Sequence, residues 1–261
     1  MFAKLLKREM KATVGYIGLL SLCALGMGVI GGFMLRYIIS AADEQQANTM
    51  VTVFGLFQVF VILGLVAYAV GGELFLAYQF YKDKFTDQGY LTFTLPAHSW
   101  QIFLSSMVNI MLWSLIIGLV TIVAVLAMFL IGIIGTPLTQ EVQSSGPMDP
   151  SLKAVFGEMA PSMVVSAISQ FISSTVMMMT AIILGSVVAK KHKILASIAM
   201  YYVCSLVYGM LSTRLLVVAM FMSEQPNLTN IYNVQTILQL AVAMGGFLLS
   251  CWLMDNKLNL P

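Results

Sequence analysis

The chain has 261 residues, of which 59% are hydrophobic and only 9% are charged, and its formal net charge is +2. Soluble domains carry far more charge, because polar side chains must cover their apolar core. The composition therefore excludes an ordinary soluble domain, and the small net charge gives no support for a nucleic-acid partner.

Six apolar runs follow one another, and each is long enough to span a membrane. A transmembrane helix needs about 20 apolar residues to cross a hydrocarbon core about 30 Å thick. Lipid cannot satisfy backbone polar groups and the alternating pattern of a transmembrane barrel is absent, so helices are predicted. The predicted fold is an all-α integral membrane protein with one domain over 1–261 and spans at about 14–35, 51–76, 102–134, 163–189, 194–222 and 234–254.

The first 13 residues precede the first apolar run and mix apolar with basic side chains. Wound as a helix, they place apolar and basic residues on opposite faces, which is typical of an interfacial helix on the inner leaflet. A disordered basic tail that only sets the topology is the alternative. The run that follows is longer than the roughly 7 to 15 residues of a signal peptide's apolar region, so we expect an uncleaved first span.

Lysine and arginine are distributed unequally between the connecting segments, which predicts the orientation. Cytoplasmic segments carry the excess of these residues. One side of the six-span topology holds ten of them and the other side three, so we expect a multi-pass protein of the cell membrane with both termini in the cytoplasm. The ten are Lys4, Lys7, Arg8, Lys11, Lys82, Lys84, Lys190, Lys191, Lys193 and Lys257, and the three are Arg36, Lys153 and Arg214.

Only two ionisable residues fall inside the apolar runs. At about 1.5 Å per residue, Glu73 lies about 33 Å from Val51, which places it at the predicted inner boundary. Arg214 lies about 30 Å from Ile194, at the predicted outer boundary, and the run continues well beyond it, so we expect a break near Arg214. Neither residue is predicted at the midplane, where coupled carriers usually hold an ionisable group.

Side chains suited to catalysis or metal binding do not gather in any run. His98 and His192 lie at predicted cytoplasmic helix ends, and we interpret Cys23, Cys204 and Cys251 as packing residues. The sequence contains no G-x-x-x-x-G-K-[ST] loop for nucleotide phosphates. We therefore expect no enzymatic activity, no cofactor and no bound metal in this chain.

The segment 136–162 between the third and fourth runs is expected to lie outside. It carries four prolines and few strand signals, so we predict a loop with one short helix around 152–158.

Polar side chains recur along the fourth run at spacings of three, four and seven, which share one helix face. Two interpretations stay open: a substrate path between subunits, or close helix packing through small hydroxyl residues, which is the commoner use of such a face. Gly28 and Gly32 repeat the packing spacing on the first run. The stripe comprises Ser162, Ser166, Ser169, Gln170, Ser173 and Thr180.

The cytoplasmic segment 77–98 between the second and third runs is rich in aromatic residues. Thr86 can cap a helix, and Leu95 followed by Pro96 would end it, so a short helix on the membrane surface is predicted. A partner protein could bind such a surface. The fourth-to-fifth loop, Lys190, Lys191, His192 and Lys193, is either a second contact for that partner or an anchor on the anionic inner leaflet.

The same segment resembles an element that follows the second helix in membrane subunits of ATP-binding cassette (ABC) transporters of the type-2 export class. That element reads YK-x-x-F-T-D-x-G-Y-L-T-x-T-L-P. The similarity extends loosely over the whole chain through the six spans and cytoplasmic termini. The matching residues are Tyr81, Lys82, Phe85, Thr86, Asp87, Gly89, Tyr90, Leu91, Thr92, Thr94, Leu95 and Pro96.

The resemblance implies a permease that pairs with a second permease subunit, identical or homologous, and with two copies of a separate ATPase that binds ATP and Mg. It also implies that this element is the coupling helix that docks in the ATPase. The last outer segment, 223–233, departs from eukaryotic members because it is too short for a large external subdomain. The implied coupling residues are Phe85, Thr86, Asp87, Gln88, Gly89, Tyr90, Leu91 and Thr92.

Two other classes of function stay open. One is a carrier or substrate-binding membrane component that is not driven by ATP. The other is a membrane partner or sensor that recruits a soluble protein through 77–98 and transports nothing.

Overall fold

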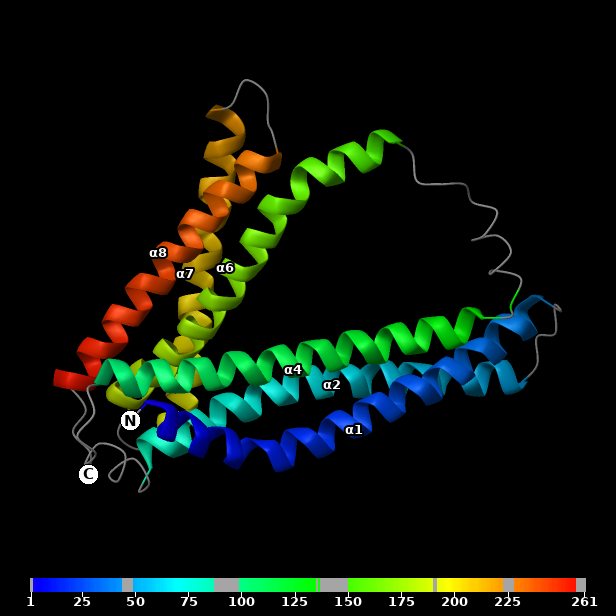
Figure 1. The fold of residues 1–261 in the computed structure, drawn as a ribbon, viewed down its shortest axis with the longest axis horizontal. Coiled ribbons are helices and arrows are strands. Elements are labelled where there is room, and N and C mark those ends of the chain that lie inside the picture. Colours follow the sequence, from blue (N-terminus) through cyan, green and yellow to red (C-terminus); the bar gives the residue numbers. More distant parts are fainter. Residues whose placement is uncertain are drawn as a thin grey trace. The chain divides into compact units, whose positions relative to one another are not determined.

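The structure, a computed structural model, describes residues 2–43, 49–86, 99–134, 136, 150–189, 192–222 and 228–256. Within these ranges nearly every residue is helical and no strand occurs (Figure 1). The helices are α1 (Phe2–Asp43), α2 (Thr49–Phe85), α4 (Ser99–Ile133), α6 (Pro150–Val188), α7 (Lys193–Met222) and α8 (Leu228–Asn256).

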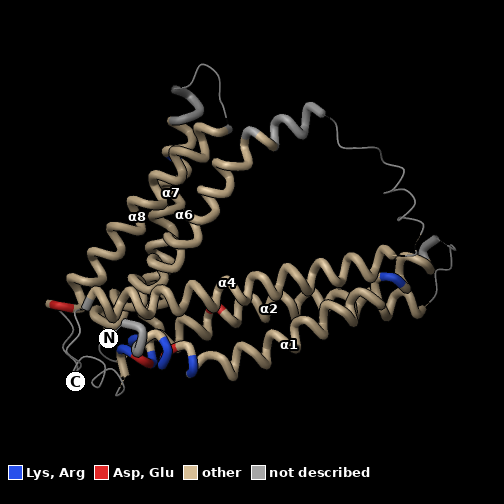
Figure 2. Tube along the Cα trace, in the orientation of Figure 1, with Lys and Arg blue, Asp and Glu red and all other residues tan. Residues whose placement is uncertain are grey.

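Each of the six helices contains a stretch long and apolar enough to cross a membrane. Charged residues in the described ranges gather toward the helix ends, with long uncharged stretches between them (Figure 2). The prediction of an all-α multi-pass membrane protein is confirmed. The stretches are Thr13–Ala41, Thr49–Phe85, Trp100–Ile133, Met159–Val188, Lys193–Val218 and Thr229–Asn256.

Several helices begin earlier or end later than their apolar runs. The basic segment at the N-terminus is helical, as predicted, but it forms the first turns of α1 without a break. The short helix predicted around 152–158 is part of α6, which begins at Pro150 and contains Pro161. Proline suits a first helical turn because its fixed φ is helical and its missing N–H would have no partner there.

The break predicted near Arg214 is wrong, because α7 is continuous from Lys193 to Met222. The side chains that precede Arg214 are compatible with this continuity. Ser212 and Thr213 both donate hydrogen bonds to the carbonyl oxygen of Gly209, at 3.3 and 2.8 Å. A hydroxyl group that bonds back to the preceding turn is satisfied inside an apolar helix. The helix can therefore continue past Arg214 without a break, although the apolar run is longer than a span needs.

The chain divides into two compact units, and α2 and α4 contribute to both. The first unit contains α6, α7 and α8 with the described residues of Met1–Leu6 and Ala77–Met111. The second contains the described residues of Lys7–Leu76 and Leu112–Pro147, which are most of α1, the first part of α2 and the second part of α4.

In the second unit, α1 and α4 approach each other at glycines. A Cβ atom on Gly28 would lie 2.5 Å from the carbonyl oxygen of Ala124, and one on Gly32 would lie 2.7 Å from the Cβ of Ile131. The packing role predicted for this pair is therefore confirmed. Ile17, Ala24 and Leu65 are buried in the same unit.

In the first unit, α6 and α7 cross closely at Gly185. A Cβ atom there would lie 2.3 Å from the Cα of Ser197, whose hydroxyl group donates to the carbonyl oxygen of Ile182 at 3.2 Å. The helices α6, α7 and α8 lie side by side (Figure 1). The ring of Phe103 in α4 meets that of Phe247 in α8 edge to face, with centroids 5.4 Å apart.

Candidate functional site

The end of α2 is the described part of the predicted coupling segment. Phe85 is buried, its ring stacks on that of Tyr81 at 6.0 Å between centroids, and the ring of Phe80 meets its edge at 6.2 Å. Thr86 donates a hydrogen bond to the carbonyl oxygen of Lys82 in the last turn of the helix. We call Phe80, Tyr81 and Phe85 the aromatic cluster. It belongs to the same compact unit as α6, α7 and α8.

The aromatic cluster arises because α2 continues nine residues past its predicted end at Leu76. The continuation from Ala77 to Phe85 contains neither glycine nor proline, so nothing in it stops the helix. The other implied coupling residues, Asp87, Gln88, Gly89, Tyr90, Leu91 and Thr92, lie outside the described residues. The structure therefore leaves their docking role as a prediction.

The basic loop before α7 is described only at its end. His192 is exposed and Lys193 begins α7, while Lys190 and Lys191 lie outside the described residues. Contact with a partner and anchoring on the leaflet both stay predictions for this loop.

The polar stripe on α6 lies against α8. The hydroxyl group of Ser169 donates to the side-chain oxygen of Gln239. Thr180 shares a hydrogen bond of 2.9 Å with Ser250 and donates to the carbonyl oxygen of Gly246 at 3.2 Å. Ser166 and Ser173 are buried on the same helix. These contacts support the packing interpretation of the stripe.

Gln170 joins all three helices of this part of the molecule. Its side-chain oxygen accepts a hydrogen bond from Gln239 Nε2 in α8 at 2.7 Å and one from the Tyr208 hydroxyl group in α7 at 3.0 Å. Ser162, at the start of the stripe, donates to the carbonyl oxygen of Met159 at 2.8 Å. We call Ser169, Gln170, Tyr208 and Gln239 the amide network.

Sequence reasoning missed two members of the amide network, Tyr208 and Gln239. The signal for Gln239 was present in the sequence, because it is one of two carboxamides inside the apolar run 234–254, and the structure buries it almost completely. A carboxamide in hydrocarbon needs a hydrogen-bond partner on another helix. The sequence alone did not show which helix supplies that partner.

Glu73 in α2 has a partner in the second unit. The hydroxyl group of Ser114 in α4 donates to Glu73 Oε2 at 2.9 Å; Ser114 is buried and Glu73 is half-buried. The depth predicted for Glu73 was counted from Val51, and α2 begins close to that residue, at Thr49, but ends beyond the predicted Leu76. Because α2 continues for 12 residues beyond Glu73, the carboxyl group lies further from the helix end than predicted.

Other polar and sulfur-containing groups in the described residues form no larger site. No group of three or more histidine, cysteine or acidic residues in the described ranges is placed to hold a metal ion. Cys23, Cys204 and Cys251 carry free thiols. Gln58 in α2 is buried and its Nε2 approaches the Met128 sulfur at 3.1 Å.

Together these features define an all-α multi-pass membrane protein with close glycine contacts in both units and a network of polar contacts between α6, α7 and α8. Comparisons with protein families, with curated proteins and with solved structures found no match.

Proposed function

We propose that the chain is the membrane subunit of an ABC exporter, which forms the substrate path and is driven by a separate ATPase. The observation that supports this proposal most is the extension of α2 into the aromatic cluster, which leads directly into the element that resembles a coupling helix. A helix that carries such an element must transmit force, and the three packed rings stiffen its last turns.

The proposed mechanism uses the division of the molecule into units. ATP binding closes the two ATPase subunits, which move the element at 85–92. The aromatic cluster belongs to the same unit as α6, α7 and α8, so a displacement of the element is passed to these three helices. A second permease subunit, identical or homologous, completes the path. The low charge of the spans favours an amphipathic or apolar cargo.

The coupling element is tested with the double variant Asp87→Ala, Tyr90→Ala. Both side chains lie in the part of the element that would enter the ATPase, so the variant should insert normally while the ATPase no longer co-purifies with it. Mass spectrometry of the gently solubilised complex measures the stoichiometry, and ATP-driven export in vesicles measures the consequence.

Asp255→Ala is the matched control, since Asp255 is an exposed acidic residue at the end of α8, outside the element. It should keep both the ATPase and export. Unchanged co-purification and export by the double variant would remove the basis of the proposal.

The same preparation tests the two other classes of function. An active complex that transports without any ATPase would favour a carrier driven by another gradient, and the Glu73 carboxyl group is the observation that favours this reading. A complex that recruits a soluble protein but moves no cargo would identify a partner or sensor.

A further inference from the structure

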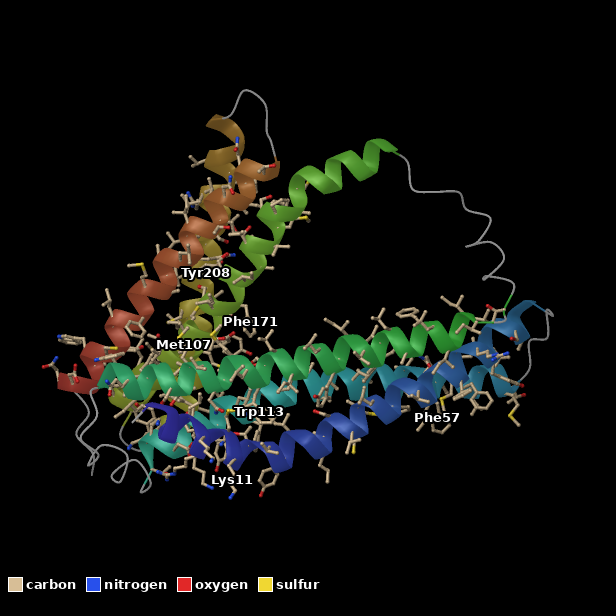
Figure 3. All side chains as sticks on the ribbon, in the orientation of Figure 1. Lys11, Phe57, Met107, Trp113, Phe171 and Tyr208 are labelled. Carbon is tan, nitrogen blue, oxygen red and sulfur yellow. The ribbon has the colours of Figure 1, made fainter. Side chains whose placement is uncertain are left out.

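Glu73 is an acidic side chain for which the described part of the chain supplies no cationic partner. Among the described residues, Ser114 is its hydrogen-bond partner, and no lysine, arginine or histidine nitrogen lies within ion-pairing distance of it. One residue earlier on α4, Trp113 buries an indole N–H that has no partner in the described ranges (Figure 3). Buried polar groups without a hydrogen-bond partner are rare in proteins.

Two helices independently place the carboxyl group well inside the spanning segments. Glu73 lies 12 residues before the end of α2 and 24 after its start, which is about 18 and 36 Å along the helix axis. Ser114 lies 15 residues after the start of α4 and 19 before its end, about 22 and 28 Å. Ionisable residues at such positions usually belong to ion or proton pathways.

The number of oxygen atoms limits which cation the pair can bind. Glu73 and Ser114 offer two carboxylate oxygens and one hydroxyl oxygen. Metal cations that prefer oxygen need about six such ligands. A proton needs only one carboxylate oxygen, and the Ser114 hydroxyl group can reverse its role and accept a hydrogen bond from the protonated acid.

We infer that Glu73 and Ser114 form a proton-binding site between α2 and α4. In the unprotonated state Ser114 donates to the carboxylate, as the structure shows. In the protonated state the acid donates to Ser114 Oγ, so uptake of one proton reverses one hydrogen bond and removes the charge. A hydrogen bond to the charged carboxylate is stronger than one from the neutral acid, so a motion that separates α2 from α4 costs more in the unprotonated state. The proton's occupancy is thereby linked to the spacing of the two helices.

Few other titratable groups accompany the pair. Between Leu112 and Ile133, α4 has none, and α1 contributes Tyr16 at this level, whose ring lies 5.6 Å from that of Phe75. On α2 itself, Tyr68 shares a hydrogen bond of 2.8 Å with Ser21. Neither of these two tyrosines carries a carboxyl group.

The inference is tested by labelling the wild-type protein in vesicles with dicyclohexylcarbodiimide, an apolar reagent that reacts with protonated carboxyl groups. The Glu73 peptide should gain one adduct in mass spectra, and the labelled fraction should fall as the pH rises. A water-soluble carbodiimide should leave this peptide unlabelled and react with Asp255, which is exposed at the end of α8.

Variants separate a proton site from a merely buried acid. Glu73→Gln should lose the adduct, and Ser114→Ala should shift the pH of half-labelling because it removes the hydrogen-bond partner. Thr121→Val is the matched control, since the Thr121 hydroxyl group bonds to the carbonyl oxygen of Ile117 on its own helix. It should leave the labelling curve unchanged.

Labelling of Glu73 at no pH, or equal labelling by the water-soluble reagent, would overturn the inference. So would a Ser114→Ala curve identical to that of the wild type. The readout requires neither cargo nor ATPase. Failure of the coupling experiment would therefore count against the proposed function, and failure of the labelling experiment would count against the proton-binding site.

Discussion

The two units both contain close glycine contacts, at Gly185 in the first and at Gly28 and Gly32 in the second, but they differ in how many polar contacts join their helices. In the first unit, α6, α7 and α8 share the amide network and a second polar contact between Thr180 and Ser250. In the second unit, α1 and α4 meet at Gly28 and Gly32, and a smaller number of polar contacts, such as that of Glu73 with Ser114, bridge its helices.

This difference shows two solutions to the same physical problem. Lipid tails are as apolar as leucine, so the hydrophobic effect does not draw spanning helices together. Close backbone approach gains dispersion energy, whereas interhelical hydrogen bonds gain energy by satisfying polar side chains that hydrocarbon cannot satisfy. Glycine contacts set how closely two backbones approach, and hydrogen bonds set which polar side chains face each other.

The largest effect is expected from Gly185→Val in the first unit. Its Cβ would lie 2.3 Å from the Cα of Ser197, a backbone atom that cannot move without shifting α7. Overpacking of this kind costs about 1 to 3 kcal/mol or more. Thermal unfolding in detergent should show a clear loss of stability.

Gly209→Val is the matched control for this change, because a Cβ on Gly209 meets no atom within 4 Å. Equal stability of the two variants would contradict the close crossing of α6 and α7.

The second largest effect is expected from Gly28→Ala in the second unit. The added methyl group would lie 2.5 Å from the carbonyl oxygen of Ala124, so α1 and α4 must separate. The expected cost is about 1 to 2 kcal/mol, since a single methyl group is smaller than a valine side chain. Gly26→Ala should be neutral or slightly stabilising in the same unfolding assay, because no atom lies within 4 Å of its Cβ position.

Comparing the two glycines sharpens the difference between the units. If polar contacts keep α6 and α7 aligned, Gly185→Val should lower stability without changing the cross-linking pattern between α6 and α8. Gly28→Ala should instead loosen α1 from α4 as a whole, seen as faster cross-linking by cysteines placed away from the contact.

The sequence predicted the number and class of helices because span length and hydrophobicity are local properties of each run. It predicted the packing use of Gly28 and Gly32 from spacing alone. Helix ends were predicted less well. Hydropathy marks where the apolar run stops, whereas α2 continues to Phe85 through residues that include neither glycine nor proline.

The partners of polar residues could not be predicted from the sequence. Spacing placed Ser166 and either Ser169 or Gln170 on one face of a helix. The identity of the facing residue depends on which helices are neighbours and on their axial offset. The same holds for Glu73, whose partner Ser114 lies 41 residues further along the chain. The expected break near Arg214 failed for a related reason, since a helix can extend beyond the hydrocarbon core without breaking.

The smallest effect is expected from Gln239→Leu, which removes the centre of the amide network. Leucine fills a similar volume, so the loss is that of hydrogen bonds to Gln170 and Ser169 rather than of packing. Hydrogen bonds between membrane helices contribute about 0.6 kcal/mol on average, and two such bonds give an expected loss of about 1 kcal/mol.

Gln235→Leu, one turn earlier on α8, makes the same chemical change at a residue for which the structure shows no hydrogen bond, so it should be neutral or stabilising. The decisive comparison is the rotation of α8 about its axis in the two variants. If the amide network fixes the orientation of α8, Gln239→Leu should change which α8 positions cross-link to α6, while Gln235→Leu should not. An unchanged pattern in both variants would mean that packing alone orients the helices of the first unit. The two units would then differ in which side chains they contain, but not in how their helices are oriented.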